Sequence, residues 1–220
     1  MKFIKTQIND LIIIEPSVFE DARGYFLETY NKQKFDDFFG KTDFIQDNES
    51  KSSKGVLRGL HFQNPPFDQA KLVRCISGKV LDVAVDLRKN SKTYGKYVSV
   101  LLSGKNKRQL FVPRGFAHGY LVLSKNATFA YKVDNIYNPN SEQGLRWNDN
   151  DLNIKWGIEN SDVIISEKDA ELKLYNEFID FGEFENSKLI QHTSTIKDAI
   201  TKNQLLVDSY FYKKQKDSNY

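Results

Sequence analysis

The feature that most constrains the fold is a series of short β-branched and aromatic runs separated by turn signals at near-regular spacing. Runs this short suit strands better than helices, which need longer segments. Glycine, proline, asparagine or aspartate lies between most of the runs, which is typical of hairpins and tight connections. The expected strands are residues 11–14, 25–30, 44–48, 70–88 as a hairpin, 97–102, 109–112, 120–123, 128–133 and 162–166.

Only a few segments have features typical of helices. Asn31 suits the N-cap of a helix over residues 32–39, and Gly40 suits its end. A further short helix is expected to open at Ser166 and to run toward Leu174. Many short strands with so few helices predict an all-β sandwich or barrel.

One strand of the expected hairpin alternates clearly and indicates which face is buried. Successive side chains of a strand point to opposite faces. The alternation therefore predicts a core face made of Leu81, Val83, Val85 and Leu87, with Val80, Asp82, Ala84 and Asp86 on the other face.

The 220-residue chain, of which 40% is hydrophobic, can form one sizeable core, and all-β domains of this length are common. We expect one domain over residues 1–183. From residue 184 the chain is rich in lysine, asparagine and serine. The composition of this extension, residues 184–220, predicts one amphipathic helix over residues 195–206 and a flexible tail.

Charge and cysteine content narrow the class of partner. The net charge is only +3, whereas nucleic-acid binding usually produces a strongly basic stripe. Cys75 is the single cysteine, so a disulfide within the chain is excluded. No apolar run suits a membrane span or a signal peptide. We expect a cytoplasmic protein with an anionic small substrate and with neither nucleic acid nor membrane as partner.

The stretch Gly55–His61 holds the first candidate site residues. Arg58 and His61 are three apart, so a regular strand would send them to opposite faces. Gly59 lies between them, and a bulge there would turn both toward one cavity. A histidine that titrates near neutral pH suits acid–base chemistry; the alternative is a core histidine satisfied by hydrogen bonds.

A second histidine, His118, follows the tight turn of residues 113–117, and the two segments together resemble the paired motifs of cupin β-barrels. Metal-binding cupins carry more histidines and a glutamate in these motifs. A transition-metal site usually needs at least three protein ligands. With only His61 and His118 in the expected barrel, we predict no metal.

An ordered set of motifs resembles one family, the dTDP-4-dehydrorhamnose 3,5-epimerases, from about residue 4 to residue 174. The resemblance implies a cupin-type jelly roll and the inversion of dTDP-4-dehydro-6-deoxy-D-glucose at C3 and C5, without a cofactor. Both carbons flank the C4 ketone, so each proton can leave as an enolate forms. The motifs are Arg23–Phe26, Gln46–Asn48, Leu57–Gln63, Lys71–Arg74, Val83–Arg88, Pro113–Gly119, Tyr131–Lys132 and Leu145–Trp147.

The resemblance implies four catalytic roles. His61 matches the general base, and Asp169 matches the carboxylate that orients it. Tyr131 matches the proton donor on the opposite face of the sugar, and Lys71 matches the cation near the enolate oxygen. On pattern alone, Tyr131 would be a rim residue, Lys71 a solvated lysine and Asp169 an ordinary helix-capping residue.

The resemblance also implies the substrate-binding residues. Arg23 and Arg58 match cations on the diphosphate, since a guanidinium forks onto phosphate oxygens, and Phe26 is a candidate stacking surface for the pyrimidine. The remaining expected polar contacts are Glu28, Gln46, Asp47, Asn48, His118, Glu142 and Lys168, together with Lys71.

Several alternatives stay open at this point. An epimerase that inverts only C3 or only C5 would use nearly the same residues, and another nucleotide would use the same diphosphate contacts. A non-catalytic cupin module and a metal-dependent cupin enzyme are the alternatives of other classes. The family resemblance also implies a homodimer in which residues 12–14 add a strand to the partner's sheet, since an unpaired strand there would expose an edge.

Overall fold

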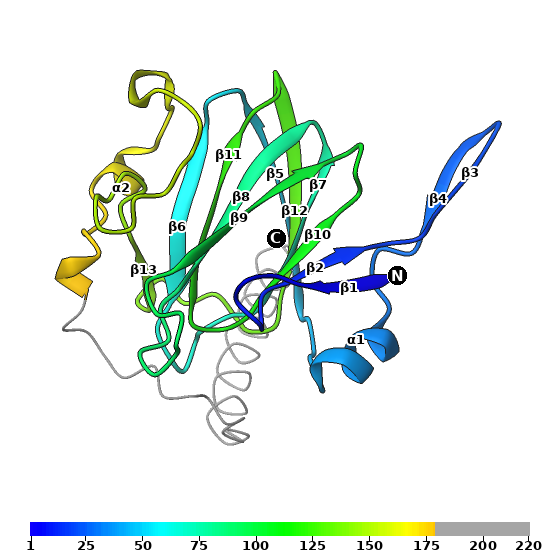
Figure 1. The fold of residues 1–220 in the computed structure, drawn as a ribbon, viewed down its shortest axis with the longest axis horizontal. Helices are drawn as coiled ribbons and strands as arrows, with labels where there is room; N and C mark the ends of the chain where they lie inside the picture. The colour runs from blue at the N-terminus through cyan, green and yellow to red at the C-terminus, as the bar shows by residue number, and fades with distance from the viewer. Residues whose placement is uncertain (179–220) are drawn as a thin grey trace, which may run out of the picture. The chain divides into compact units, whose positions relative to one another are not determined.

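The computed structural model describes residues 1–178, which form two antiparallel sheets and a separate hairpin (Figure 1). The first sheet has the order β1 (Lys2–Lys5), β2 (Ile12–Glu15), β10 (Gln109–Val112), β7 (Lys71–Ser77), β12 (Asn126–Val133) and β5 (Gln46–Ser53). The second has the order β13 (Glu142–Gly144), β6 (Leu57–Gln63), β11 (Phe116–Val122), β8 (Lys79–Asp86) and β9 (Tyr97–Ser103). The hairpin is β3 (Val18–Asp21) with β4 (Gly24–Leu27).

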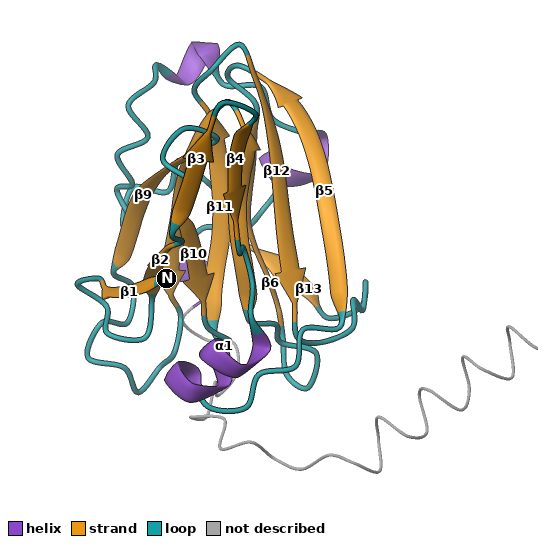
Figure 2. Cartoon of the chain, turned by 90° about the vertical axis from the view of Figure 1, so that its right-hand side faces the viewer, coloured by secondary structure: helices purple, strands orange, loops and turns teal. Residues whose placement is uncertain are grey.

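Helices are short in the described part of the chain, so the prediction of an all-β fold with a few short helices is confirmed. The expected helix is α1 (Lys32–Phe39), where the Asn31 side chain accepts a hydrogen bond from the Lys34 amide. Figure 2 shows it below the strands. The others are α2 (Glu167–Ala170), η1 (Asn160–Asp162) and η2 (Asn176–Phe178).

The segment 162–166 was expected to form a strand, and this expectation was wrong. Here the chain leaves η1, and Ile164 makes only an isolated parallel bridge with Val56. The second expected helix is also shorter than predicted, because α2 ends at Ala170. The predicted extension from residue 184, with its helix over 195–206, lies outside the described residues.

The interior between the sheets is filled from both of them. Val73 and Phe129 of the first sheet pack with Val80, Ala84 and Tyr120 of the second. The prediction that Leu81, Val83, Val85 and Leu87 form the core face was therefore incomplete, because the opposite face of β8 lines the space between the sheets.

The face of β8 that carries Val83 and Val85 is buried as well, but against another layer. It packs with Trp147 and Trp156 of the long segment after β13. A central strand covered on both sides has no solvent face, and Asp82 and Asp86 are accordingly fully buried.

The predicted bulge at Gly59 is confirmed by the register of β6 and β11. His61 lies opposite His118 and Arg58 lies opposite Tyr120, with a register shift between the pairs. Residues paired across an antiparallel ladder share a face, and His118 and Tyr120 are two apart on one strand. Arg58 and His61 therefore share a face despite their odd spacing.

Gly59 is required because the backbones of β6 and β11 approach each other closely at the bulge. Its φ is +119°, and an added Cβ would lie 2.6 Å from the Gly119 Cα and 2.7 Å from the His118 carbonyl oxygen. Both of these atoms belong to the backbone of β11, so neither can move aside without shifting the strand. The bulge that aims His61 therefore depends on the absence of a side chain at residue 59.

We predict that Gly59→Ala lowers the free energy of unfolding by about 2 kcal/mol or more, because it adds strain and overlap at a buried strand. Urea denaturation would measure this change. Gly24→Ala is the matched control, since Gly24 also has a left-handed φ of +129° but no atom lies within 4 Å of an added Cβ. Equal losses in the two variants would contradict the role given to the close approach.

No helix within residues 1–178 combines the length and the hydrophobicity needed to cross a membrane.

Cys75 is buried, as expected of a small core residue.

Candidate functional site

Polar side chains gather on the inner faces of both sheets. Phe129 fills the interior, and Tyr131 lies two residues along the same face of β12. Tyr131 pairs with Asn48 of β5, and Lys71 of β7 lies opposite Val133, so all three share this face. The second sheet contributes Arg58, His61 and His118 from its own inner face. The two sheets thus present different chemical groups to one interior.

His61 and Asp169 form a close pair although they are far apart in sequence. The His61 Nε2 lies 2.8 Å from the Asp169 Oδ1, and the Gly59 amide donates to the Oδ2 over 3.1 Å. Asp169 lies in α2, where its own amide donates to the side chain of the N-cap Ser166. One carboxylate therefore holds both the imidazole and the bulge that aims it.

Asp169 is ionised in this arrangement. Burial by itself would raise the pKa of its carboxyl, but the hydrogen bond with His61, the charge interaction with the imidazole and the Gly59 amide together lower that pKa below its ordinary value. An ionised carboxylate only accepts hydrogen bonds. The His61 Nε2 must then carry its proton, which leaves Nδ1 of the neutral ring as the basic atom.

Lys71 is half-buried rather than solvated, in contrast to what its pattern alone indicates. Its Nζ donates to the His61 carbonyl oxygen over 3.4 Å. Burial lowers the pKa of this ammonium to about 8, although the charges of Asp82 and Glu142 favour its charged form. The group is a cation next to His61 that loses its proton slightly above neutral pH.

The lowered pKa of Lys71 predicts how kcat depends on pH. If the Lys71 ammonium supports catalysis, activity falls as the pH rises through about 8. Arginine keeps its charge at any usual pH, so Lys71→Arg is expected to lower kcat but to remove this alkaline limb. A pH profile of kcat for both proteins would measure the effect, with Lys79→Arg on an exposed residue as the control. An unchanged alkaline limb in Lys71→Arg would contradict the assignment.

Tyr131 is also half-buried, not a rim residue. Burial raises the pKa of its phenol, with Tyr120 and Glu142 adding to the effect and Arg58 opposing it. The phenol is therefore protonated at neutral pH and can act as an acid at the start of a reaction.

Glu142 and Lys168 form an ion pair beside these groups. The Lys168 Nζ donates to the Glu142 Oε2 over 2.6 Å, and the Tyr137 hydroxyl donates to the same oxygen. Burial raises the pKa of Glu142, but these two hydrogen bonds outweigh it and the pKa falls below its ordinary value. The sequence did not single out Tyr137, which comes from an irregular loop without a strand pattern.

His118 is a buried partner of Asp82. Its Nε2 lies 3.0 Å from both carboxylate oxygens of Asp82, and both side chains are almost fully buried. The histidines of the two histidine–aspartate pairs thus lie on neighbouring strands, β6 and β11, and face the interior.

Four expected binding residues, Arg23, Phe26, Glu28 and Asp47, are not brought to this site. Arg23 and Phe26 lie on the β3–β4 hairpin, which extends away from the two sheets (Figure 1). Phe26 is 70% exposed, Arg23 pairs only with the neighbouring Asp21 among the described residues, and Glu28 pairs with Lys34. Among the other expected residues, Gln46 and Asn48 lie on the inner face of the edge strand β5, whereas Asp47 pairs with Lys132 on the opposite face.

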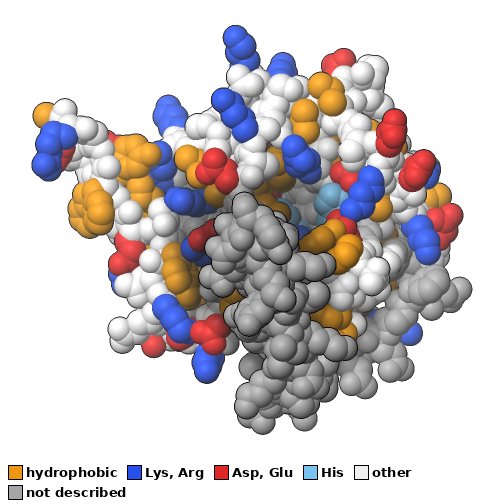
Figure 3. Space-filling view, turned by 180° about the vertical axis from the view of Figure 1, so that it is seen from behind, with side chains coloured by type: hydrophobic (Ala, Val, Ile, Leu, Met, Phe, Trp, Pro, Cys, Tyr) orange, Lys and Arg blue, Asp and Glu red, His pale blue; other side chains and the backbone are white. Residues whose placement is uncertain are grey.

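Figure 3 shows histidine side chains on one face of the molecule, among basic, acidic and hydrophobic groups. Within residues 1–178 there is no group of three or more histidine, cysteine, aspartate and glutamate side chains that could hold a metal ion.

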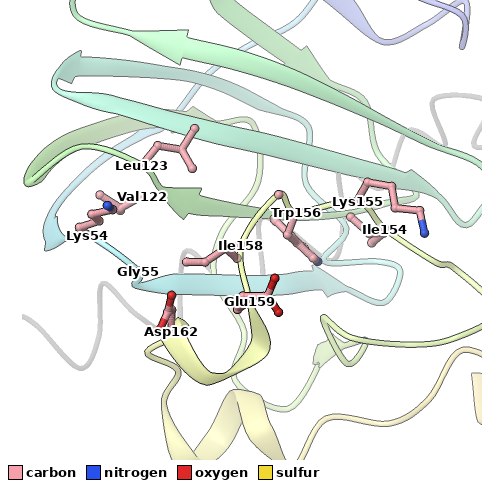
Figure 4. Close-up of a pocket in the computed structure, with 11 residues that line it drawn as sticks. Lys54, Gly55, Val122, Leu123, Ile154, Lys155, Trp156, Ile158, Glu159 and Asp162 are labelled. Atoms are coloured by element: carbon pink, nitrogen blue, oxygen red, sulfur yellow. The ribbon is translucent and has the colours of Figure 1, made fainter.

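A separate hollow of about 870 Å³ lies beside the turn before β6 and the end of β11 (Figure 4). It is lined by Lys54, Val122, Trp156, Ile158 and Asp162 among others, and none of the expected site residues lines it.

Comparison with known proteins decides the family. The family model described as dTDP-4-dehydrorhamnose 3,5-epimerase matches residues 5–177. The dTDP-4-dehydrorhamnose 3,5-epimerase of Escherichia coli K12 is 52% identical over 180 residues, covering 81% of this chain and 97% of that protein. This chain belongs to the dTDP-4-dehydrorhamnose 3,5-epimerase family. The predicted family, its isomerase class and the cupin-type fold are thereby confirmed.

Solved structures of the epimerase family support the same family assignment. The 3,5-epimerase of Legionella pneumophila in complex with dTDP-4-keto-L-rhamnose matches with a TM-score of 0.79 and 46% identity, covering 84% of this chain and 98% of that one. A 3'-monoepimerase of Streptomyces bikiniensis in complex with dTDP-quinovose matches with a TM-score of 0.72 and 30% identity, covering 77% and 86%. This chain is thus more similar in sequence to the 3,5-epimerase than to this monoepimerase.

Proposed function

We propose that the protein inverts C3 and C5 of dTDP-4-dehydro-6-deoxy-D-glucose to give dTDP-4-dehydro-L-rhamnose, without a cofactor. The observation that carries the proposal is the placement of His61 and Tyr131 on the inner faces of two opposed sheets. A sugar ring between the sheets would present one face to the imidazole and the other to the phenol. Inversion of a carbon next to a ketone needs this arrangement.

The steps follow from the protonation states of the two groups. The His61 Nδ1 takes the proton from C3 or C5, and the electron pair of the C–H bond moves into the C4 carbonyl to form an enolate. The enolate carbon then takes the Tyr131 proton on its opposite face as the C4 ketone reforms. Inversion leaves an imidazolium at His61 and a phenolate at Tyr131. Asp169 supports the first charge, and general acid–base groups of this kind contribute about 10²–10⁴-fold to rate.

We assign the stabilisation of the enolate oxygen to Lys71 and His118. Both lie beside His61, one through the contact of its ammonium with the His61 carbonyl oxygen and the other as its cross-strand partner. Donors that are fixed before the reaction lower the barrier without reorganising during it. We assign the C4 oxygen to the space near these two groups.

The nucleotide is expected to contact the charged groups at the edge of the interior. Arg58 would bind the diphosphate, with Gln46 and Asn48 of the edge strand beside it, and Glu142 and Lys168 complete the expected polar contacts. The Asp47 side chain lies on the opposite face of β5, paired with Lys132. We propose a cytoplasmic location, which the single buried Cys75 supports.

The second copy of a homodimer would supply Arg23, Phe26 and Glu28. In a single chain these residues lie on or just after a hairpin that extends from the sheets, and its aromatic side chains Phe19 and Phe26 are 65% and 70% exposed. Exposed aromatic residues on a protruding hairpin are typical of protein–protein contacts. Strand β2, which was expected to add to the partner's sheet, pairs on both sides with β1 and β10 of its own chain. The β3–β4 hairpin is therefore the surface that we expect to meet the partner.

We predict that sedimentation at micromolar concentration shows a dimer. The paired substitutions Phe19→Ser and Phe26→Ser are expected to shift the distribution toward monomer, because they remove exposed apolar area. Ile164→Ser, which removes another exposed hydrophobic side chain away from the hairpin, is the control. A monomer in the unmodified protein, at any concentration in this range, would rule the arrangement out.

The direct test of the proposed function is incubation with the 4-keto sugar nucleotide in D₂O, with isotopic analysis of each carbon. We expect deuterium at both C3 and C5 and a product of L configuration. Deuterium at one carbon alone would support the monoepimerase alternative, and no deuterium at either would support a non-catalytic module.

A further inference from the structure

Inversion at two carbons with one acid and one base requires that both groups regain their starting protonation states between the two inversions. After the first inversion Tyr131 is a phenolate and His61 an imidazolium, so neither group can act on the second carbon. Both must return to their starting states while the sugar is still bound. The interior must therefore contain a route by which a proton reaches Tyr131.

A buried pair of hydroxyl groups lies next to Tyr131. The Tyr120 hydroxyl is 2.8 Å from the Ser50 Oγ, within hydrogen-bond distance, and either oxygen can donate. Tyr120 is only 5% exposed, and its ring stacks on Phe129 with centroids 4.1 Å apart. The contact joins β11 of one sheet to β5 of the other, across the same interior that holds the site.

The register places this pair close to the Tyr131 side chain. Ser50 lies opposite Phe129 and Asn48 lies opposite Tyr131, so Ser50 and Tyr131 are diagonal neighbours on one face. Diagonal neighbours on one face are about 7–8 Å apart, a gap that a tyrosine side chain and one bridging water can span. The charge interaction of Tyr120 with the Tyr131 phenol is a second sign of their proximity.

Ser50 gives the pair a route to solvent. It is only half-buried and belongs to β5, the last strand of its sheet. Figure 2 shows β5 at the edge beside β12.

We propose that Tyr120 and Ser50 form a proton relay that returns Tyr131 to its acid form between the two inversions; this rests on the proposed function. Water gives a proton to Ser50, Ser50 gives its own to Tyr120, and Tyr120 gives its proton through a bridging water to the Tyr131 phenolate. His61 releases its extra proton to water. The enzyme ends with as many protons as it had, and no redox change occurs.

The relay differs from a merely structural hydroxyl pair in one measurable way. The first inversion uses the proton that Tyr131 holds at rest, whereas the second needs the relay. With enzyme in excess over dTDP-4-dehydro-6-deoxy-D-glucose in D₂O, Tyr120→Phe is expected to invert the first carbon at the unmodified rate. Inversion of the second carbon, measured by chiral analysis of the labelled sugar, is expected to slow by about tenfold or more.

The experiment includes two further variants. Ser50→Ala removes the outer hydroxyl and is expected to act in the same direction, which keeps the test valid if Tyr120→Phe folds poorly. Tyr97→Phe is the matched control, because its hydroxyl bonds to Asn153 and Lys155 in the long segment after β13, and it should behave as the unmodified protein does.

The outcomes distinguish a proton relay from a merely structural pair of hydroxyl groups. Slowing at the second carbon alone, in Tyr120→Phe or Ser50→Ala, supports the relay. Unchanged rates at both carbons, or equal slowing at both, overturn it while leaving the proposed epimerisation intact. Failure of the unmodified protein to label either carbon would instead remove the proposed function itself.

Discussion

Replacing His61 by asparagine is expected to reduce the rate of epimerisation by about 10³-fold, within the range that general bases contribute. Asparagine can still donate a hydrogen bond to Asp169, so the carboxylate that now lies 2.8 Å from the imidazole keeps a partner. What the variant loses is the basic Nδ1, and with it the atom that removes the proton from C3 and C5. Exchange of both carbons with D₂O should fall together with product formation.

Two measurements distinguish loss of the base in His61→Asn from loss of folding. Thermal unfolding and the dissociation constant for dTDP should be unchanged in His61→Asn, because dTDP lacks the sugar on which His61 acts. If the variant folds, binds dTDP and still exchanges C3 and C5 at the unmodified rate, the assignment of the base is wrong.

Replacing Tyr131 by phenylalanine is expected to separate isotope exchange from inversion. His61 would still remove a proton and could return a deuteron to the same face, so label would enter with the original configuration kept. Formation of the inverted product should fall by about 10²-fold or more, because no acid remains on the other face. Chiral analysis of the labelled sugar after incubation in D₂O measures both quantities in one sample.

Tyr97→Phe again serves as the matched control, since it removes a phenol hydroxyl in contact with the long segment after β13. It should invert and exchange normally. Inverted product formed by Tyr131→Phe at the unmodified rate would show that another group supplies the proton.

Local chemistry explains which parts of this site could be predicted from the sequence. The bulge between Arg58 and His61 was predictable because glycine alone fits a left-handed backbone pressed against another strand. The helix after Asn31 was predictable for a similar reason, since its cap and its stop are encoded within a few residues.

Features that depend on distant segments were harder to predict. The alternation of β8 indicated one core face, but the segment containing Trp147 and Trp156 covers that face while the other lines the space between the sheets. The contact of Asp169 with His61 spans 108 residues and was expected only because of the family resemblance. Lys71 is half-buried because of the strands that surround it. The sequence pattern near Lys71 does not indicate this burial.

The most direct test of this account is a crystal structure of the protein with dTDP-4-dehydro-L-rhamnose. We expect the sugar ring between the two sheets, with the His61 imidazole on one face and the Tyr131 hydroxyl on the other, each within about 3.5 Å of C3 or C5. A sugar ring bound with both groups on the same face, or bound in the hollow beside Trp156, would contradict it.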